Sequence, residues 1–243
     1  MNHVIFNGVD LTTLGLYVSG DKTFDSPEKN YTKVSIPGRS GDLYISDGSY
    51  KNVKLKYDAI LIPPNGKTFS EAAADLRNFL LSVDGYGRIE DDYNPDEYRM
   101  GVYSGPISFK PERFIAGTTN LEFNCMPQRW LISGILPVNI HHEDQITNPT
   151  SNVSKPLLKI PSNSSSNVEI SAAGMSITVK KRSFLVYINC ETMDCYTISQ
   201  GSIIPKNDLI EVPNEFISLP PGTSTFEITG TDMISVTPRW FIL

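Results

Sequence analysis

Two adjacent histidines followed by two carboxylates form the densest group of potential metal ligands in the sequence. They are His141, His142, Glu143 and Asp144, in a chain that has only three histidines. A zinc site needs ligands that converge on one point, whereas neighbouring residues of an extended segment point to opposite faces. We therefore predict no metal site here and interpret the group as a solvated polar connector between domains.

A second cluster of oxygen ligands has part of the pattern of a calcium loop. Asp92, Asn94 and Asp96 alternate as the first ligands of such a loop do. The loop also needs glycine at its sixth position and glutamate at its twelfth, but Glu97 and Tyr103 occupy these positions. The run from 91 to 97 therefore predicts a charged hairpin turn.

Local signatures of enzymes are missing from the sequence. There is no G-x-S-x-G nucleophile elbow, no complete G-x-G-x-x-G and no phosphate-binding loop. Catalytic triads can also be assembled from distant residues, so this pattern disfavours an enzyme without excluding one. We expect a non-enzymatic protein that needs no cofactor.

Charge and hydropathy limit the partners of the chain. It has 21 basic and 27 acidic residues, a net charge of −6, so we expect no specific binding to DNA. No run approaches the ~18 apolar residues of a membrane-spanning helix, and the N-terminus lacks a signal-peptide pattern. This predicts synthesis in the cytoplasm without membrane insertion. The odd number of cysteines, Cys125, Cys190 and Cys195, predicts reduced thiols.

The elements that carry these residues are mostly strands. In the first half, Val53, Leu55 and Tyr57 alternate with lysines, which predicts a strand with one buried face. One amphipathic helix is predicted from about 69 to 83, because apolar residues recur there every three or four positions. Thr68 and Glu71 form a capping box before it, and Gly85 follows where a left-handed C-terminal cap is expected.

Periodicity is lost between 131 and 156, and we place a domain boundary near Ser133. This predicts domains at 1–133 and 134–243. Beyond the boundary, short strand-like runs separated by polar or Pro/Gly turns recur about every ten residues. The second domain is therefore predicted to be an antiparallel β-sandwich or barrel, and the chain as a whole is mainly β.

Two short motifs stand out as structural. Pro37, Gly38, Arg39 and Gly41 lie in the segment SIPGRSGDLYISDGSYKNV, where turn-forming residues, with Asp47 and Gly48 after them, predict tight turns with positive-φ glycines. Pro238, Arg239 and Trp240 lie close to the C-terminus, and MPQRW and TPRW end the two predicted domains alike.

These motifs carry a family resemblance. The opening IFNGVDLTTLGLYV, the IPGRSGDL segment, the YKNVKLKY strand and the single helix resemble the N-terminal domain of siphophage distal tail proteins (Dit). SKPLLKI, INCETMDCY, FISLPPGTSTFEITG and ISVTPRW resemble the C-terminal domain of that family in the same order. Asn189 and Ser224 depart from the family pattern, which usually has aspartate and asparagine there.

The resemblance implies a fold and a function. The fold would be an N-terminal β-sheet domain with one α-helix, followed by a galectin-like antiparallel β-sandwich without a long inserted arm. Six copies would form a hexameric ring, the hub at the tip of a long non-contractile tail. This ring would join the tail tube protein to a tail-associated lysin or adhesin, and DNA would pass through its channel without specific binding. The protein would be found in the virion, at the phage tail tip, after synthesis in the bacterial host cytoplasm.

A carbohydrate-binding host-adhesion module is the alternative, because a galectin-like sandwich suggests sugars. Sugar platforms usually need exposed aromatic rings. Trp130 and Trp240 lie at the ends of the predicted domains beside apolar strands, so we expect them to be buried. Fold similarity alone cannot establish sugar binding.

Overall fold

The computed structural model of the chain describes residues 2–18, 20, 22, 25–112 and 115–243. The chain divides into two compact units, Met1–Arg129 with Leu243, and Trp130–Ile242. The predicted boundary near Ser133 lies inside the short 3-10 helix η2 (Ile132–Ile135) at the start of the second unit. That residues 134–243 fold by themselves stays a prediction.

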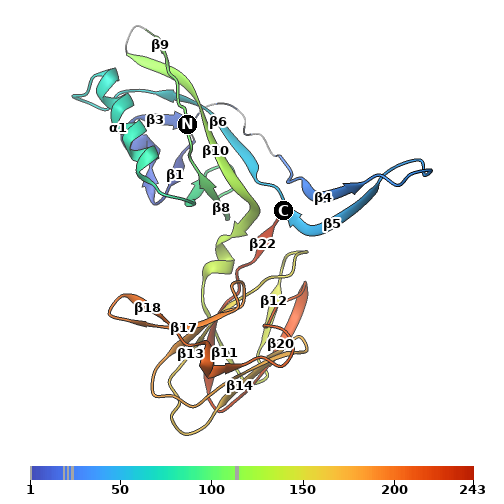
Figure 1. The fold of residues 1–243 in the computed structure, drawn as a ribbon. Coiled ribbons are helices and arrows are strands. Elements are labelled where there is room, and N and C mark those ends of the chain that lie inside the picture. Colours follow the sequence, from blue (N-terminus) through green and yellow to red (C-terminus); the bar gives the residue numbers. More distant parts are fainter. Residues whose placement is uncertain (1, 19, 21, 23–24, 113–114) are drawn as a thin grey trace. The chain divides into compact units, whose positions relative to one another are not determined.

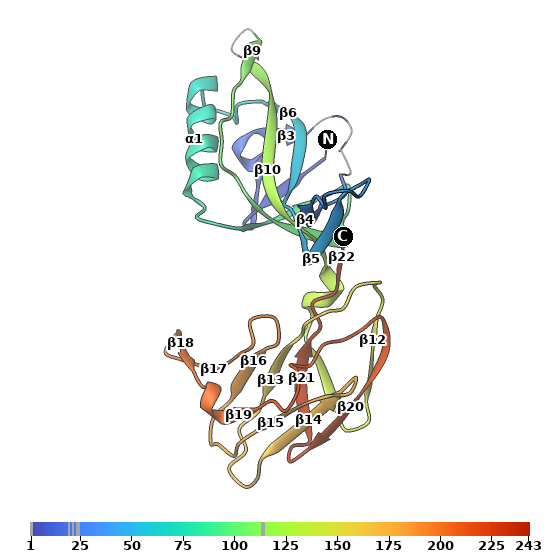
Figure 2. The same cartoon turned by 45° about the vertical axis from the view of Figure 1, so that its right-hand side comes forward.

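The first unit is built on a curled antiparallel sheet (Figures 1 and 2). In spatial order its strands are β2 (Val9–Asp10), β1 (Val4–Phe6), β7 (Gly87–Asp91), β8 (Glu97–Val102), β10 (Ala116–Leu131), β6 (Val53–Leu61) and β3 (Leu16–Val18). A short strand, β9 (Lys110–Glu112), also pairs with β10, and the 3-10 helix η1 (Leu11–Leu14) precedes β3. The strands predicted on both sides of the acidic run are β7 and β8, and the run forms the turn between them.

The alternation in β6 explains why this sheet has one buried face. Leu55 and Tyr57 are buried, whereas the lysines between them are exposed. The partner strand β10 buries Leu121 and Phe123, which lie opposite Tyr57 and Leu55 in the antiparallel register. Apolar residues on one face of paired strands thus form the core of the first unit, as the period of two predicts.

The one α-helix in the described part of the chain is α1 (Phe69–Ser82), which packs on the buried face of the sheet (Figure 2). Its buried side chains are Ala72, Ala73, Leu76 and Leu80. The predicted capping box is present, but the C-cap is Val83, which is extended, so Gly85 is not the predicted left-handed cap. Gly85 has a φ of 73° and therefore turns the chain two residues after Val83.

We expect Thr68→Ala to lower the free energy of unfolding by about 1 kcal/mol. Thr68 Oγ1 accepts a hydrogen bond from the Glu71 N–H at 3.3 Å, and Glu71 Oε2 accepts one from the Thr68 N–H at 2.8 Å. Chemical denaturation of the full chain measures the loss. Ser70→Ala is the matched control, because Ser70 is exposed and its side chain makes no hydrogen bond within the described residues. Equal stability of the two variants would count against the cap.

The second unit is a sandwich of two antiparallel sheets (Figure 2). One sheet contains, in order, β11 (Val138–His141), β21 (Met233–Thr237), β13 (Leu157–Ile160), β16 (Val186–Asn189), β17 (Asp194–Ser199) and β18 (Ser202–Pro205). The other contains β12 (Gln145–Asn148), β20 (Gly222–Thr229), β14 (Val168–Ala172), β15 (Met175–Val179) and β19 (Ile210–Glu211). The 3-10 helix η3 (Asn207–Leu209) precedes β19, and β22 (Phe241–Ile242) ends the chain. The mainly β fold predicted from the sequence, with a helix in the first unit and a sandwich in the second, is confirmed.

The interpretation of 131–156 as a connector is wrong in one respect. This stretch contains the strands β11 and β12 of the sandwich, and the two histidines lie at the turn between these strands. His141 Nδ1 lies 3.1 Å from Asp144 Oδ2, and His142 Nδ1 accepts the Ile228 N–H at 3.0 Å. The group is therefore a turn within the second unit.

All three cysteines are free and buried. Burial raises the pKa of the Cys125 and Cys195 thiols to about 11 and that of Cys190 to about 12. The thiols are therefore protonated at neutral pH and pack as small apolar groups. No helix in the described ranges is long and apolar enough to cross a membrane.

Candidate functional site

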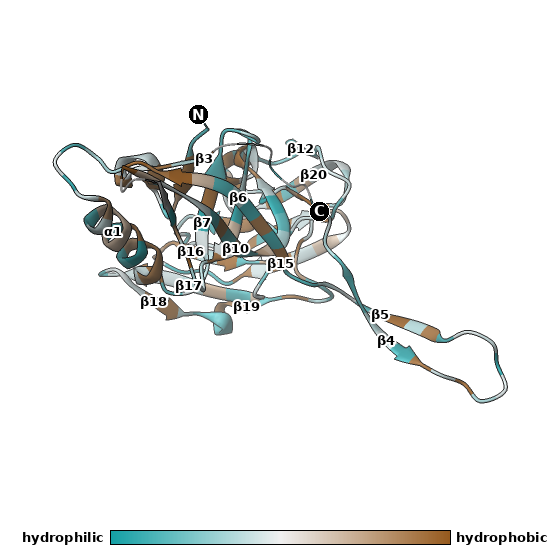
Figure 3. Cartoon of the chain, turned by 90° about the horizontal axis from the view of Figure 1, so that it is seen from above, coloured by the Kyte–Doolittle hydropathy of each residue, from teal (hydrophilic) through white to brown (hydrophobic). Residues whose placement is uncertain are grey.

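The predicted turn motif of the first unit lies at the tip of a separate hairpin. Among the described strands, β4 (Lys29–Val34) and β5 (Leu43–Tyr50) pair only with each other and form a two-stranded sheet. Figures 1 and 3 show this hairpin extending away from the main sheet of its unit. Its loop, residues 35–42, carries all four predicted motif residues: Pro37, Gly38, Arg39 and Gly41.

Glycines set the backbone of this loop. Gly38 and Gly41 have φ angles of 82° and 87°, which confirms the predicted left-handed conformations. Between them, the Arg39 N–H donates to the Ile36 carbonyl at 3.1 Å and closes a tight turn. Gly48 also has a positive φ of 81°, but it lies within β5 where the register shifts, so it forms a bulge and not the predicted turn.

Both faces of the hairpin expose apolar side chains. Tyr31 and Tyr44 are 50% and 58% exposed and touch each other edge to face, with ring centroids 5.8 Å apart. Val34 pairs with Leu43, and Ile45 lies on the same face, because it pairs with Thr32 two residues away. Figure 3 shows apolar colouring along β5. The apolar residues of the hairpin that are exposed are Tyr31, Val34, Ile36, Leu43, Tyr44 and Ile45.

Such a hairpin lacks a core of its own. An isolated two-stranded sheet is at best marginally stable in water, and exposed apolar strands favour association with another chain. Residues of β4 and β5 contribute nothing to the hydrophobic core of the first unit. We therefore identify this hairpin as the candidate assembly surface of the chain.

A buried ion pair joins Lys22, four residues after the end of β3, to the end of β7. Lys22 Nζ lies 2.5 Å from Asp91 Oδ2, and both side chains are almost fully buried. The Tyr57 hydroxyl donates to the same carboxylate oxygen at 2.5 Å. Burial lowers the pKa of Lys22, while Asp91 opposes this shift by favouring the ammonium form. Sequence reasoning missed this pair, since residues 69 positions apart leave no local signal.

Substitution of the glycines at the tip should affect folding and association more than their solvent exposure suggests. We expect Gly38→Val and Gly41→Val each to cost roughly 1–2 kcal/mol locally, because left-handed backbone is unfavourable for a side chain. No atom lies within 4 Å of a Cβ added at either position, so crowding contributes nothing. The measurement is self-association by sedimentation at high concentration, alongside thermal melting. Ser40→Val, in the same loop without a positive φ, is the control. Both glycine variants associating like the wild type would refute the expectation.

The second predicted motif lies inside the second unit. Trp240 is buried, and the Leu131 N–H donates to its carbonyl at 2.9 Å. Arg239 adopts a φ of 61°, and its N–H donates to the Gly134 carbonyl at 2.7 Å. The Ser154 hydroxyl donates to the carbonyl oxygens of Pro238 and Arg239. These hydrogen bonds join residues 238–240 to Leu131, Gly134 and Ser154 of the same unit.

Arg239 also explains why asparagine is compatible with position 189. Its Nη1 donates to the Asn189 Oδ1 at 2.7 Å. An amide oxygen supplies the acceptor that a carboxylate would supply, without its charge. Pro238, Arg239 and Trp240 thus make their contacts within the second unit, whereas the four tip residues lie on an exposed hairpin of the other unit.

The described side chains do not assemble a metal site. Within the described ranges, no group of three or more His, Cys, Asp and Glu side chains could hold a metal ion. In the acidic turn, Asp91 Oδ1 accepts the N–H groups of Tyr93 and Asn94, each at 3.1 Å. This carboxylate is therefore used to shape the turn.

Comparisons with known proteins agree with this architecture. Residues 9–125 match the family model of the phage tail protein RIFT-related domain. The whole chain is similar in fold to the distal tail protein (Dit) of phage SPP1, described as a paradigm of the hub adsorption apparatus in phages that infect Gram-positive bacteria. The TM-score is 0.75 at 16% identity, with 100% of both chains covered.

A second similar structure is a chain of the phage P2 baseplate in its activated conformation with Ca. Here the TM-score is 0.53 at 7% identity, and 97% of each chain is covered. No curated protein sequence matches this chain. Residues 9–125 are therefore similar to the RIFT-related domain of phage tail proteins, and the chain has the fold of a distal tail protein, which confirms the resemblance predicted from its sequence.

Proposed function

We propose that this protein is a structural component of the virion that forms the hub at the distal end of a long non-contractile phage tail. The observation that carries this proposal is the fold shared over the full chain with a hub protein, together with the tail-protein domain at residues 9–125. The hub joins the tail tube protein to a tail-associated lysin or adhesin. It is a non-enzymatic protein, made in the cytoplasm of the bacterial host and incorporated at the tail tip.

Six copies form a closed ring, and the hairpin β4–β5 makes the contact between neighbours. A hairpin that lies on a different surface of the next copy makes a head-to-tail contact, which either closes into a ring or propagates as a fibre. A hub with a fixed diameter requires closure. The exposed apolar faces around Tyr31, Tyr44 and Ile45 supply the area that such a contact buries.

The acidic net charge of the chain fits a ring through which DNA passes. The net charge of −6 per chain disfavours a channel that holds phosphates by counterion release. A neutral or acidic lining lets DNA pass without specific binding.

The carbohydrate-binding alternative is supported by no specific observation. Trp240 is buried in the core of the second unit. Trp130 is partly buried and packs its ring against Phe241, with centroids 5.3 Å apart. Neither indole offers the exposed face on which a sugar would stack.

Immunogold labelling of intact particles tests the proposed location. Antibodies against the purified protein should label the distal end of the tail in electron micrographs. Labelling of the capsid, or of the host cell fraction without any particle, would overturn the assignment to the tail tip.

A further inference from the structure

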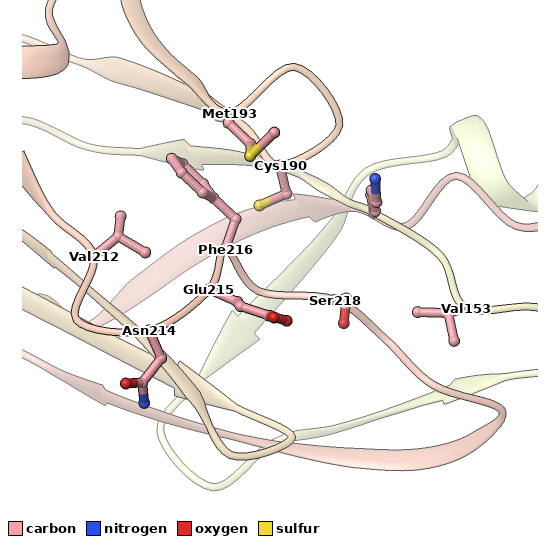
Figure 4. A pocket seen from close by; sticks show the side chains of 9 residues that line it. Val153, Cys190, Met193, Val212, Asn214, Glu215, Phe216 and Ser218 are labelled. Carbon is pink, nitrogen blue, oxygen red and sulfur yellow. The ribbon is translucent and has the colours of Figure 1, made fainter. Parts of the chain in front are cut away.

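The second unit contains a pocket of about 550 Å³ that is built by three separate segments. Val153 and Lys155 come from the segment before β13, and Cys190 and Met193 come from the turn between β16 and β17. The third wall is the segment between β19 and β20, which includes Phe216. Figure 4 shows these side chains from close by.

Five of the nine residues that line the pocket are apolar. Its apolar lining residues are Val153, Cys190, Met193, Val212 and Phe216. Val153 is 50% exposed, whereas Phe216 packs against the core of the unit. Pockets of this size and polarity are typical of sites that bury a ligand of a few residues or fewer.

Met193 is held in an unfavourable backbone conformation at the rim. Its φ is 59°, a left-handed value that glycine or asparagine adopts more readily at the end of a hairpin loop. Its side chain is nevertheless 60% exposed and gains little from burial within this chain. A strained, exposed apolar residue beside a pocket is better explained by an external contact than by folding.

The rim carries one positive and one negative side chain. Lys155 and Glu215 are exposed, and neither makes an ion pair or hydrogen bond with any residue that the structure describes. The main-chain N–H groups of Glu215 and Phe216 likewise have no acceptor within the described ranges. Main-chain N–H groups of this kind can donate to the carbonyls of an extended peptide, and an apolar pocket beside them can hold one of its side chains.

We propose that this pocket binds an extended segment of a partner protein that inserts one apolar side chain against Phe216 and Met193. An acidic residue of that segment faces Lys155, and a basic one faces Glu215. The inference rests on the proposed function, since a hub must hold other tail-tip proteins. A saccharide is disfavoured, because no Trp or Tyr lines the pocket.

A library of short random peptides, displayed and selected on the full-length protein, provides the probe. Selected peptides should share an apolar residue between an acidic and a basic one. Met193→Gly should weaken their binding about tenfold or more, the loss expected when a buried methionine contact is removed. Fluorescence polarisation of labelled peptides measures this affinity.

The matched control is Gln200→Gly. Gln200 also has a left-handed φ, 51°, in the turn between β17 and β18, and it does not line the pocket. Neither glycine variant should lower the melting temperature, because each removes an unfavourable backbone conformation. Only Met193→Gly should lose peptide affinity.

Charge exchange tests the orientation of the segment. Glu215→Lys should weaken a selected peptide, and replacing the basic residue of that peptide by glutamate should restore binding. Three results would overturn the proposal. They are the absence of any enriched peptide, equal peptide affinity of the wild type and Met193→Gly, and a saccharide, found on a glycan array, that displaces the bound peptide. Loss of this site would leave ring formation intact, whereas failure of the hub assignment would appear as absent rings.

Discussion

Replacing the hairpin from Lys29 to Tyr50 by a short Gly-Ser turn should abolish assembly into rings while both units remain folded. The replacement is geometrically simple, because the Lys51 N–H donates to the Glu28 carbonyl at 2.8 Å directly below the hairpin. The removed residues contribute nothing to either hydrophobic core. Their apolar faces are the surface that we assign to the contact between copies.

Sedimentation at high concentration and circular dichroism on the shortened protein separate assembly from folding. The control is Ile203→Ser in the hairpin β17–β18, which also exposes a large apolar residue, 67% accessible. This control should assemble normally. Rings formed by the shortened protein would show that the contact between copies lies elsewhere.

Trp240→Ala should lower the free energy of unfolding of the second unit by about 3–5 kcal/mol. Trp240 is 5% exposed and belongs to the core of that unit. A Cβ on Gly134 would lie 2.4 Å from the main-chain nitrogen of Trp240, so the backbone of residue 134 already lies close to that of residue 240. Removing the indole therefore leaves a cavity that the neighbouring backbone cannot fill easily.

Chemical denaturation followed by circular dichroism measures this loss. Trp130→Phe is the matched control, because it keeps a ring against Phe241 and removes an indole N–H that has no acceptor among the described residues. The control should change stability little. A loss below about 1 kcal/mol for Trp240→Ala would show that the C-terminal motif does not hold the unit together.

Elements with a strong internal period could be predicted from the sequence. The strand β6 alternates strictly, and α1 has both an apolar face and a capping box, so local residues alone define these elements. The left-handed glycines at 38 and 41 were predicted for the same reason, since few other residues adopt such angles.

Strands β11 and β12 could not be recognised. Each is an edge strand of its sheet and pairs on one side only. Each is only four residues long, and in β11 only Ile140 is buried, so neither contributes a long run of apolar residues. Their assignment depends on the neighbours β21 and β20, which are more than seventy residues away in the chain.

The roles of the site residues depended on tertiary contacts in the same way. Arg239 adopts a positive φ that its residue type does not suggest, and Lys22 finds its partner in another part of the sequence. The hairpin residues Tyr31 and Tyr44 have the pattern of a strand pair, but nothing in the sequence reveals that no other described element covers them. Apolar strands left uncovered by their own chain are what a contact between copies requires.

Electron microscopy of the concentrated purified protein and of the tail tip of intact particles tests the central claim most directly. Dilute solution is less informative, because association depends on concentration. We predict closed six-fold rings in which the hairpin β4–β5 of each copy lies on its neighbour. Absence of such rings from both preparations, or rings whose hairpins extend freely into solvent, would contradict the account.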